Sequence, residues 1–295
     1  MATIGEWIEG ARLRTLPMAV APVAIGAGAA FEQGAFSWLR TGLALLVALF
    51  LQIGVNYSND YSDGIRGTDD VRVGPQRLTA SGAAPAKTVR NAALLNYALA
   101  GLAGLALVLL SGAWVFLIIG LAAVIAAWGY TGGKNPYGYR GLGEVFVFIF
   151  FGLVAVLGTQ YTQSLQLSLV AFIGACSTGL LATALLMANN IRDIPTDQEV
   201  GKRTLAVRLG DGHARTSYVL MVALAILLPI TLVGSYPWVL LSLLVIPMCI
   251  QPCWTVLRSE SPVQLIPVLR QTGLINLAFG LLFGGGLVIQ TLFFN

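Results

Sequence analysis

The stretch that decides the fold joins an apolar run, LALLVALFLQIGV (residues 43–55), to an acidic one, NDYSDGIRGTDD (residues 59–70). The acidic segment holds four aspartates in twelve residues, although only 10% of the chain is charged. A helix needs about 20 mostly apolar residues to cross the hydrocarbon core of a bilayer. The two runs together predict a membrane-spanning helix that ends in a cluster of carboxylates.

The composition of the whole chain agrees with this interpretation. Of its 295 residues, 57% are hydrophobic, and the charged share lies well below the roughly 25% of soluble domains. We therefore predict a single all-α integral membrane domain over residues 1–295, because helices satisfy their own backbone hydrogen bonds in lipid. The predicted spans are nine, over residues 15–33, 39–61, 91–110, 113–130, 142–160, 168–192, 216–234, 237–257 and 272–291.

The charged residues gather on one side of this predicted bundle. Gly34 and Pro237 lie in short turns on the opposite side, where Arg40 is the only one of 17 lysines and arginines, and Glu32 the only one of 13 acids. By the positive-inside rule the charged side faces the cytoplasm. The basic residues border the membrane, which suits anionic lipid or an anionic substrate and argues against nucleic acid.

A second acidic cluster, NNIRDIPTDQEVGKRTLAV (residues 189–207), matches the first. Asn59 and Asn189, like Asp63 and Asp193, are 130 residues apart, and a basic and threonine-containing element, QRLTASG or GKRTL, follows each cluster. Four predicted spans separate the two clusters, and this even number gives them the same orientation. The pattern predicts a parallel internal repeat that brings two acidic helix ends to one side of the membrane.

Within each cluster the aspartates are spaced to share a helical face. Asp60 and Asp63 are three residues apart, and Asp193 and Asp197 are four apart. Like charges at this spacing repel, and Mg²⁺, which prefers carboxylate oxygens together with substrate phosphates, would offset them. The predicted catalytic residues are therefore these four aspartates, and amide oxygens add to the predicted metal ligands, which are Asn59, Asp60, Asp63, Asn189, Asp193 and Asp197, with Asn190 beside them.

Basic residues in the neighbouring loops complete the pattern of a diphosphate site. They are Arg66, Arg72, Arg77, Lys134, Arg140, Lys202 and Arg203. Metal ions bridge phosphate oxygens, arginine and lysine bind the remaining ones, and together they stabilise a leaving diphosphate. The alternative is a solvated acidic face that pairs with local cations. Two clusters with matched spacing, side and basic tails favour the diphosphate site.

These motifs resemble those of the UbiA superfamily of intramembrane aromatic prenyltransferases, whose first motif reads N-D-x-x-D-x-x-x-D before an arginine and a Ser-Gly. Asn59, Asp60, Asp63, Arg77 and the pair Ser81–Gly82 match it, and Asp193 and Asp197 match the second motif, D-x-x-x-D. Gly67 stands at the position of the last aspartate of the first motif. The resemblance implies that Asp69, two residues further on, takes its place as a metal ligand.

Further stretches resemble the menaquinone branch of that superfamily. They are Gly67-x-Asp69, RTLPMAVAPVAIG (14–26), YTGGKNPYGYRGLGEVFVFIFFGLVAVLGTQY (130–161) and GKRTLAVRLG (201–210). The resemblance covers about residues 5–215 and adds Arg14 as a diphosphate contact. It implies a nine-helix bundle with a central cavity, Mg²⁺ as cofactor, and transfer of a polyprenyl group from polyprenyl diphosphate to 1,4-dihydroxy-2-naphthoate in a bacterial cell membrane. Diphosphate and CO₂ are lost and demethylmenaquinol is formed.

The loop after the fourth span supplies the predicted acceptor-binding residues, which are Tyr130, Lys134, Tyr137, Tyr139, Arg140 and Glu144. The tyrosines either shield an allylic cation by cation–π contact or lie at the membrane interface as belt residues. Lys134 and Arg140 are candidates to bind the naphthoate carboxylate or the diphosphate. Glu144 lies inside a span, where an acid is a functional candidate, but Arg140 four residues earlier is an alternative partner.

Two other functions remain to be weighed. A UbiA-type enzyme could use another aromatic acceptor, such as 4-hydroxybenzoate or a tetrapyrrole. An ion-coupled transporter would place ionisable groups near the bilayer midplane, whereas here the acids gather at one border. In the last predicted span, the Gly280-x-x-x-Gly284 pattern predicts close helix packing, with dimerisation as the alternative.

Overall fold

The computed structural model describes residues 2–68 and 77–294, and every regular element in those ranges is helical. The α-helices are α1 (Ile4–Gly10), α2 (Pro17–Glu32), α3 (Trp38–Arg66), α4 (Ala86–Ser111), α5 (Val115–Gly129), α6 (Gly143–Val147), α7 (Ala155–Ser164), α8 (Leu169–Arg192), α9 (Ile194–Glu199), α10 (Leu205–Leu209), α11 (Asp211–Leu227), α12 (Ile246–Arg258) and α13 (Ile266–Phe294). Short 3-10 segments run over Leu13–Thr15, Tyr137–Arg140, Leu228–Leu232, Pro237–Val245 and Pro262–Leu265, and a π-helical segment over Phe148–Val154.

The chain is an integral membrane protein by the length and apolarity of these helices. Among the described residues, seven helical segments are long and apolar enough to cross a membrane, and an eighth follows if the pair Ile4–Thr15 and Pro17–Glu32, bent by 47°, forms one span. Helix α5 is apolar but only 15 residues long. The all-α membrane fold is thus confirmed, whereas the count of nine spans stays a prediction.

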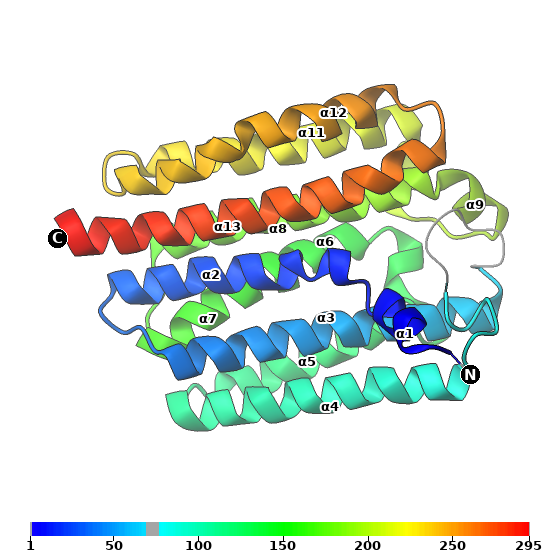
Figure 1. Ribbon diagram of the computed structural model, residues 1–295, viewed down its shortest axis with the longest axis horizontal. Coiled ribbons are helices and arrows are strands. Elements are labelled where there is room, and N and C mark those ends of the chain that lie inside the picture. The colour runs from blue at the N-terminus through cyan, green and yellow to red at the C-terminus, as the bar shows by residue number, and fades with distance from the viewer. Residues whose placement is uncertain (1, 69–76, 295) are drawn as a thin grey trace.

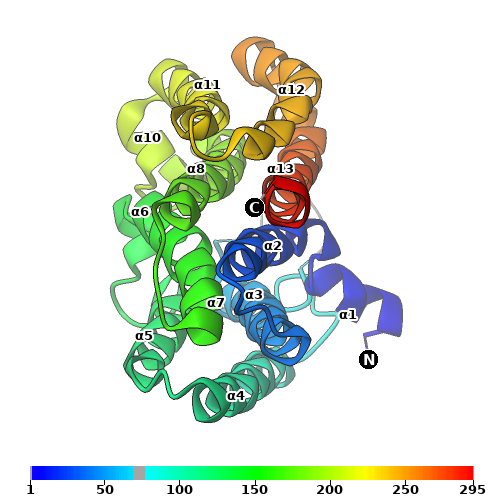
Figure 2. The same ribbon diagram turned by 90° about the vertical axis from the view of Figure 1, so that its left-hand side faces the viewer.

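Helix α2 lies in the middle of the bundle, where it contacts α3, α7, α8 and α13 (Figure 2). Small residues allow its close approach to α13. A Cβ on Gly280 would lie 2.6 Å from the Ala21 carbonyl oxygen, and a Cβ on Gly28 would lie 2.6 Å from that of Gly284. The predicted close packing at Gly280-x-x-x-Gly284 is therefore found, and it joins two helices of one chain.

The two helices that carry the acidic motifs begin alike. The side chains of Ser37 and Ser168 each accept a hydrogen bond from a backbone N–H in the first turn, of Arg40 in α3 and Ala171 in α8. Both helices run in the same direction and end on the side of the bundle where α1 and α9 lie (Figure 1). Both acidic motifs consequently reach the same side of the molecule, as the sequence predicts.

Helix α3 ends at Gly67, whose φ of +72° is a left-handed conformation that glycine adopts without strain. The N–H groups of Gly67 and Thr68 close the helix on the carbonyls of Gly64 and Asp63. Most L-residues disfavour this conformation, and aspartate adopts it less readily than glycine. The helix end thus gives a physical reason for glycine at the position where the superfamily motif has its last aspartate.

Candidate active site

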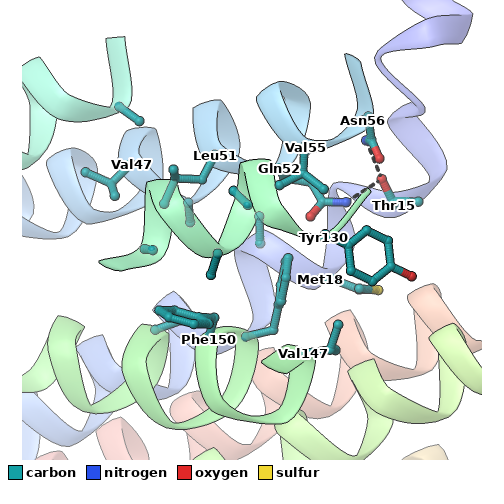
Figure 3. Close-up of a pocket in the computed structure, with 18 of the residues that line it drawn as sticks. Thr15, Met18, Val47, Leu51, Gln52, Val55, Asn56, Tyr130, Val147 and Phe150 are labelled. Carbon is teal, nitrogen blue, oxygen red and sulfur yellow. Dashed lines mark hydrogen bonds between the residues drawn. The ribbon is translucent and has the colours of Figure 1, made fainter. Parts of the chain in front are cut away.

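A cavity of about 590 Å³ opens between α2, α3, α4, α5, the segment 143–164 and the end of α8. One end is polar and includes Asn59, Asp60, Asp63, Asn189 and Lys202. The other end is lined by apolar side chains, among them Val47, Leu51, Leu105, Phe116 and Phe150 (Figure 3). The cavity can therefore hold a molecule with an anionic head and a long hydrocarbon tail.

The two aspartates of the first motif are buried, and different groups hold them. The Asp60 side chain accepts hydrogen bonds from the backbone N–H groups of Leu78 and Thr79, both at 2.8 Å, and Asp60 is only 1% exposed. Asp63 accepts from the Tyr139 hydroxyl at 2.8 Å. Asp60 thus anchors the loop that follows the motif, while Asp63 is joined to the loop between α5 and α6.

Replacing Asp60 with alanine is expected to lower the unfolding temperature of the purified protein by several degrees. The change leaves the buried N–H of Leu78 without its acceptor, along with the N–H of Thr79, and an unsatisfied buried donor costs about 1–3 kcal/mol. Thermal unfolding in detergent measures the effect. Asp63→Ala is the control, because Asp63 accepts no backbone N–H from the described part of that loop, residues 77–85; equal melting temperatures for the two variants would contradict the anchoring role.

The loop after α5 is hydrogen-bonded to the end of α3, which carries the first motif. The Thr131 hydroxyl donates to the Asn59 amide oxygen at 2.8 Å, and Arg66 donates to the carbonyls of Thr131 and Gly133. Burial raises the pKa of Tyr139, and the negative charge of Asp63 raises it further. Tyr139 therefore stays protonated and continues to donate to Asp63.

Aromatic rings from the same loop line the cavity wall. Tyr130 and Tyr137 both line it, and their ring centroids are 5.6 Å apart. Tyr137 also stacks on Phe146 at 4.0 Å. Burial raises the pKa values of both tyrosines, that of Tyr130 well above its ordinary value, so both are neutral near pH 7. Of the two earlier alternatives, a position on the cavity wall fits these two residues better than a place in an interfacial belt.

The second motif is arranged differently from the first. Arg192 donates to both carboxylate oxygens of Asp193 at 2.7 Å and to the amide oxygen of Asn189 at 2.9 Å. The Lys202 ammonium lies 3.3 Å from an Asp197 oxygen. Arg192, Asn189 and Lys202 line the cavity, whereas the two aspartates stand behind them. Arg192 and Lys202 therefore neutralise the negative charges of Asp193 and Asp197, which would otherwise repel one another.

Glu144 has a partner other than the one the sequence suggested. It accepts a hydrogen bond from the Asn190 amide at 2.9 Å, and no ion pair with Arg140 is found among the described residues. Arg140 is exposed because the turn at Gly141 separates it from the start of α6. Asn190 lines the cavity, whereas Glu144 lies behind it.

The predicted cationic residues divide into two groups. Arg14, Arg77 and Lys202 line the cavity. The others lie away from its wall: Arg66 reaches loop carbonyls, Lys134 and Arg140 are exposed, and Arg203 lines a second pocket with Arg208. The predictions for Asp69 and Arg72 fall outside the described residues.

Several residues of the site were not predicted from the sequence. Arg192 lies between the motif residues Asn189 and Asp193, yet only the fold shows that it binds both. Gln52 and Asn56 also line the cavity. The sequence could have predicted both, because they are polar residues in an apolar span and lie eight and four residues before Asp60, on the same face of the helix. Thr131 carries no such signal in the sequence.

The residues present fit a divalent cation held jointly with a substrate. Among residues 2–68 and 77–294, no three His, Cys, Asp or Glu side chains come close enough to bind a metal ion by themselves. The cavity nevertheless gathers carboxylate and amide oxygens from Asn59, Asp60, Asp63 and Asn189. Mg²⁺ is typically bound by one or two carboxylates, waters and substrate phosphates, so this donor set suits it.

The fold and the site together define an all-helical integral membrane protein with an acidic and amide-rich site at one end of a deep apolar cavity. Residues 19–288 match the UbiA prenyltransferase family, and the chain belongs to it. The recognition of this family from the two aspartate motifs is thereby confirmed.

Individual relatives and a solved structure agree with this assignment. The chain is 49% identical, over 99% of its length and 100% of the relative's, to the 1,4-dihydroxy-2-naphthoate octaprenyltransferase of Mycobacterium tuberculosis. It is 47% identical to the Mycobacterium leprae protein of the same name, over 98% of each chain. The structure of a UbiA homolog from Archaeoglobus fulgidus bound to GPP and Mg²⁺ has a TM-score of 0.68 at 16% identity, covering 96% of this chain and 99% of that one, and shares the fold.

Proposed function

We propose that this protein transfers a polyprenyl group from polyprenyl diphosphate to 1,4-dihydroxy-2-naphthoate, in a bacterial cell membrane and with its site on the cytoplasmic face. The observation that carries the proposal is the cavity, whose polar end, with carboxylates, amides and cations, leads into an apolar space suited to a prenyl chain. Relatives at 47–49% identity bear the name of this activity, which supports the choice of acceptor. A bundle of nine spans, built as a parallel repeat, belongs to the same proposal.

The overall reaction is an electrophilic aromatic substitution. The bond between C1 of the prenyl group and the diphosphate oxygen breaks, and diphosphate leaves with the electron pair. The ring carbon that bears the carboxylate forms a bond to C1. The bond to the carboxylate then breaks, CO₂ is lost, and its electron pair restores the aromatic ring, which gives demethylmenaquinol.

The residues of the chain have distinct parts in this reaction. Asn59, Asp60, Asp63 and Asn189 would hold Mg²⁺, which would supply charge neutralisation to the leaving diphosphate. Asp193 and Asp197, also predicted as ligands, would instead position Arg192 and Lys202 at the cavity wall. Lys202 and Arg192 lie where they can bind phosphate oxygens. The rings of Tyr130 and Tyr137 face the region where the allylic cation develops, and they exclude water from it.

An assay of the purified protein tests the proposal directly. The protein in detergent is supplied with Mg²⁺, a polyprenyl diphosphate, and either 1,4-dihydroxy-2-naphthoate or 4-hydroxybenzoate. Mass spectrometry is expected to find a prenylated and decarboxylated product of the naphthoate. Transfer to 4-hydroxybenzoate alone would reassign the acceptor. The absence of transfer to either compound would refute the proposed prenyltransferase activity.

Lys202→Ala is expected to raise the KM for prenyl diphosphate about 10- to 100-fold, with a much smaller effect on the KM for the acceptor. Lys202 lines the cavity, and a hydrogen bond to a charged group is worth about 1.5–3 kcal/mol. Steady-state kinetics with each substrate varied in turn measure the change. Lys87→Ala is the matched control, since Lys87 is exposed and away from the cavity wall; a larger effect of Lys202→Ala on the acceptor KM would reverse the assignment of the two subsites.

A further inference from the structure

A polar group lies midway along the cavity, between its acidic end and its apolar end. Gln52 and Asn56 of α3 face Thr15, which precedes α2, and all three line the cavity (Figure 3). Gln52 comes eight residues before Asp60, about 12 Å along the helix axis. The group therefore lies where the diphosphate end gives way to the space for hydrocarbon.

The hydrogen bonds of Thr15 fix which way the two amides point. The Thr15 hydroxyl donates to the Arg12 carbonyl at 2.9 Å, so towards other groups it can only accept. It accepts from Gln52 Nε2 at 2.8 Å and from Asn56 Nδ2 at 3.0 Å, and the latter also donates to the Ala11 carbonyl at 2.9 Å. Both amides therefore direct their nitrogens to Thr15, and turning Asn56 over would place its oxygen against the Ala11 carbonyl.

This arrangement leaves the Gln52 oxygen without a partner. Gln52 is 4% exposed, and its Oε1 is buried with no hydrogen bond to the described part of the chain. In Figure 3 the nitrogen faces Thr15, and the oxygen is turned away from it, between α3 and the opposite side of the pocket. A buried acceptor left unsatisfied costs about 1–3 kcal/mol, so a bound ligand that donates a hydrogen bond here gains that energy.

The chemistry of the proposed substrates selects the donor. A prenyl diphosphate carries phosphate oxygens and hydrocarbon, neither of which donates a hydrogen bond to an amide oxygen. The carboxylate of the acceptor is likewise an acceptor only. The hydroxyl groups on the aromatic ring are the donors that remain.

We propose that Gln52, held by Thr15, accepts a hydrogen bond from a ring hydroxyl of the aromatic acceptor and so selects hydroxylated rings. This inference rests on the proposed function for the identity of the acceptor. It assigns to Gln52 a role in specificity: the amide oxygen orients the ring so that its reacting carbon faces C1 of the prenyl group. A site built to bind a hydroxyl discriminates strongly against analogues that lack it.

The test compares binding of 1,4-dihydroxy-2-naphthoate with that of 2-naphthoate, which has no hydroxyl groups, to the purified full-length protein. Isothermal titration in detergent gives the ratio of the two affinities without requiring turnover. Gln52→Leu is expected to reduce this ratio about 10-fold, while the KM for prenyl diphosphate stays within about twofold. Gln52→Met serves as a second apolar variant in case Gln52→Leu does not fold, because methionine is unbranched like glutamine, whereas leucine is branched.

Gln290→Leu is the matched control. Gln290 of α13 also has a buried side-chain oxygen without a partner among the described residues, but it lies away from the cavity wall. This variant is expected to keep the wild-type ratio. An unchanged ratio in folded Gln52→Leu or Gln52→Met would overturn the inference.

Failure of the proposed function would give a different result. If the wild type prenylates 4-hydroxybenzoate and not the naphthoate, the acceptor is reassigned, and the same ratio is measured with 4-hydroxybenzoate against benzoate. A loss of that ratio in Gln52→Leu would then still support hydroxyl binding by Gln52.

Discussion

Turnover falls about 100- to 1000-fold when Asp63 is replaced by alanine, if the site works as proposed. Asp63 lines the acidic end of the cavity, and its carboxylate joins the first motif to Tyr139. Removing one group that stabilises developing charge in an enclosed site typically costs this factor in rate. The rate of product formation at saturating concentrations of both substrates, with Mg²⁺ present, measures the loss.

The control for this variant is Asp211→Ala. Asp211 is an exposed acid that pairs with Arg215 at 2.7 Å, and it lies away from the cavity wall. It should leave the rate unchanged. If Asp63→Ala retains near-normal activity while folded, Asp63 has no part in binding the metal and the diphosphate.

Chelation of divalent cations with EDTA is expected to lower turnover on the order of 1000-fold, and added Mg²⁺ should restore it. The charge of a leaving diphosphate is stabilised by several kcal/mol when a metal ion binds it. The first-motif side chains at the cavity end are acids and amides, which cannot supply that stabilisation themselves. Initial rates measured before chelation, after it, and after addition of excess Mg²⁺ give the two changes.

Two further measurements separate loss of metal from loss of fold. The unfolding temperature should change little on chelation, because the described carboxylates already have hydrogen bonds or ion pairs within the protein. Binding of prenyl diphosphate, measured by titration, should weaken in EDTA and recover with Mg²⁺. Full activity in the presence of EDTA would refute a metal-dependent reaction.

The sequence was sufficient to predict the membrane class and the position of the acidic motifs. Long apolar runs decide the class because the bilayer requires them, and an even number of spans between the motifs places both on one side. The number of spans was harder to predict. Helix α5 is apolar but short, and the chain bends between Thr15 and Pro17. Neither α5 nor this bent pair of helices is therefore a single straight helix long enough to span the membrane.

The partners of the site residues could be predicted only in part. Spacing along a helix indicates that Asp60 and Asp63 are near one another, but their hydrogen bonds come from Leu78, Thr79 and Tyr139, which the fold brings in from elsewhere. Glu144 shows the same limit. A partner four residues away was available in the sequence, yet the amide of Asn190, from another helix, binds it.

The end of α3 at Gly67 has a consequence for how such sites evolve. A substitution that restored aspartate at residue 67 would recreate the superfamily motif in the sequence. The new carboxylate would lie just beyond the end of α3, in a left-handed residue, and would not share the helical face of Asp60 and Asp63. The direction of a carboxylate at residue 67 therefore depends on where α3 ends as well as on the residue type.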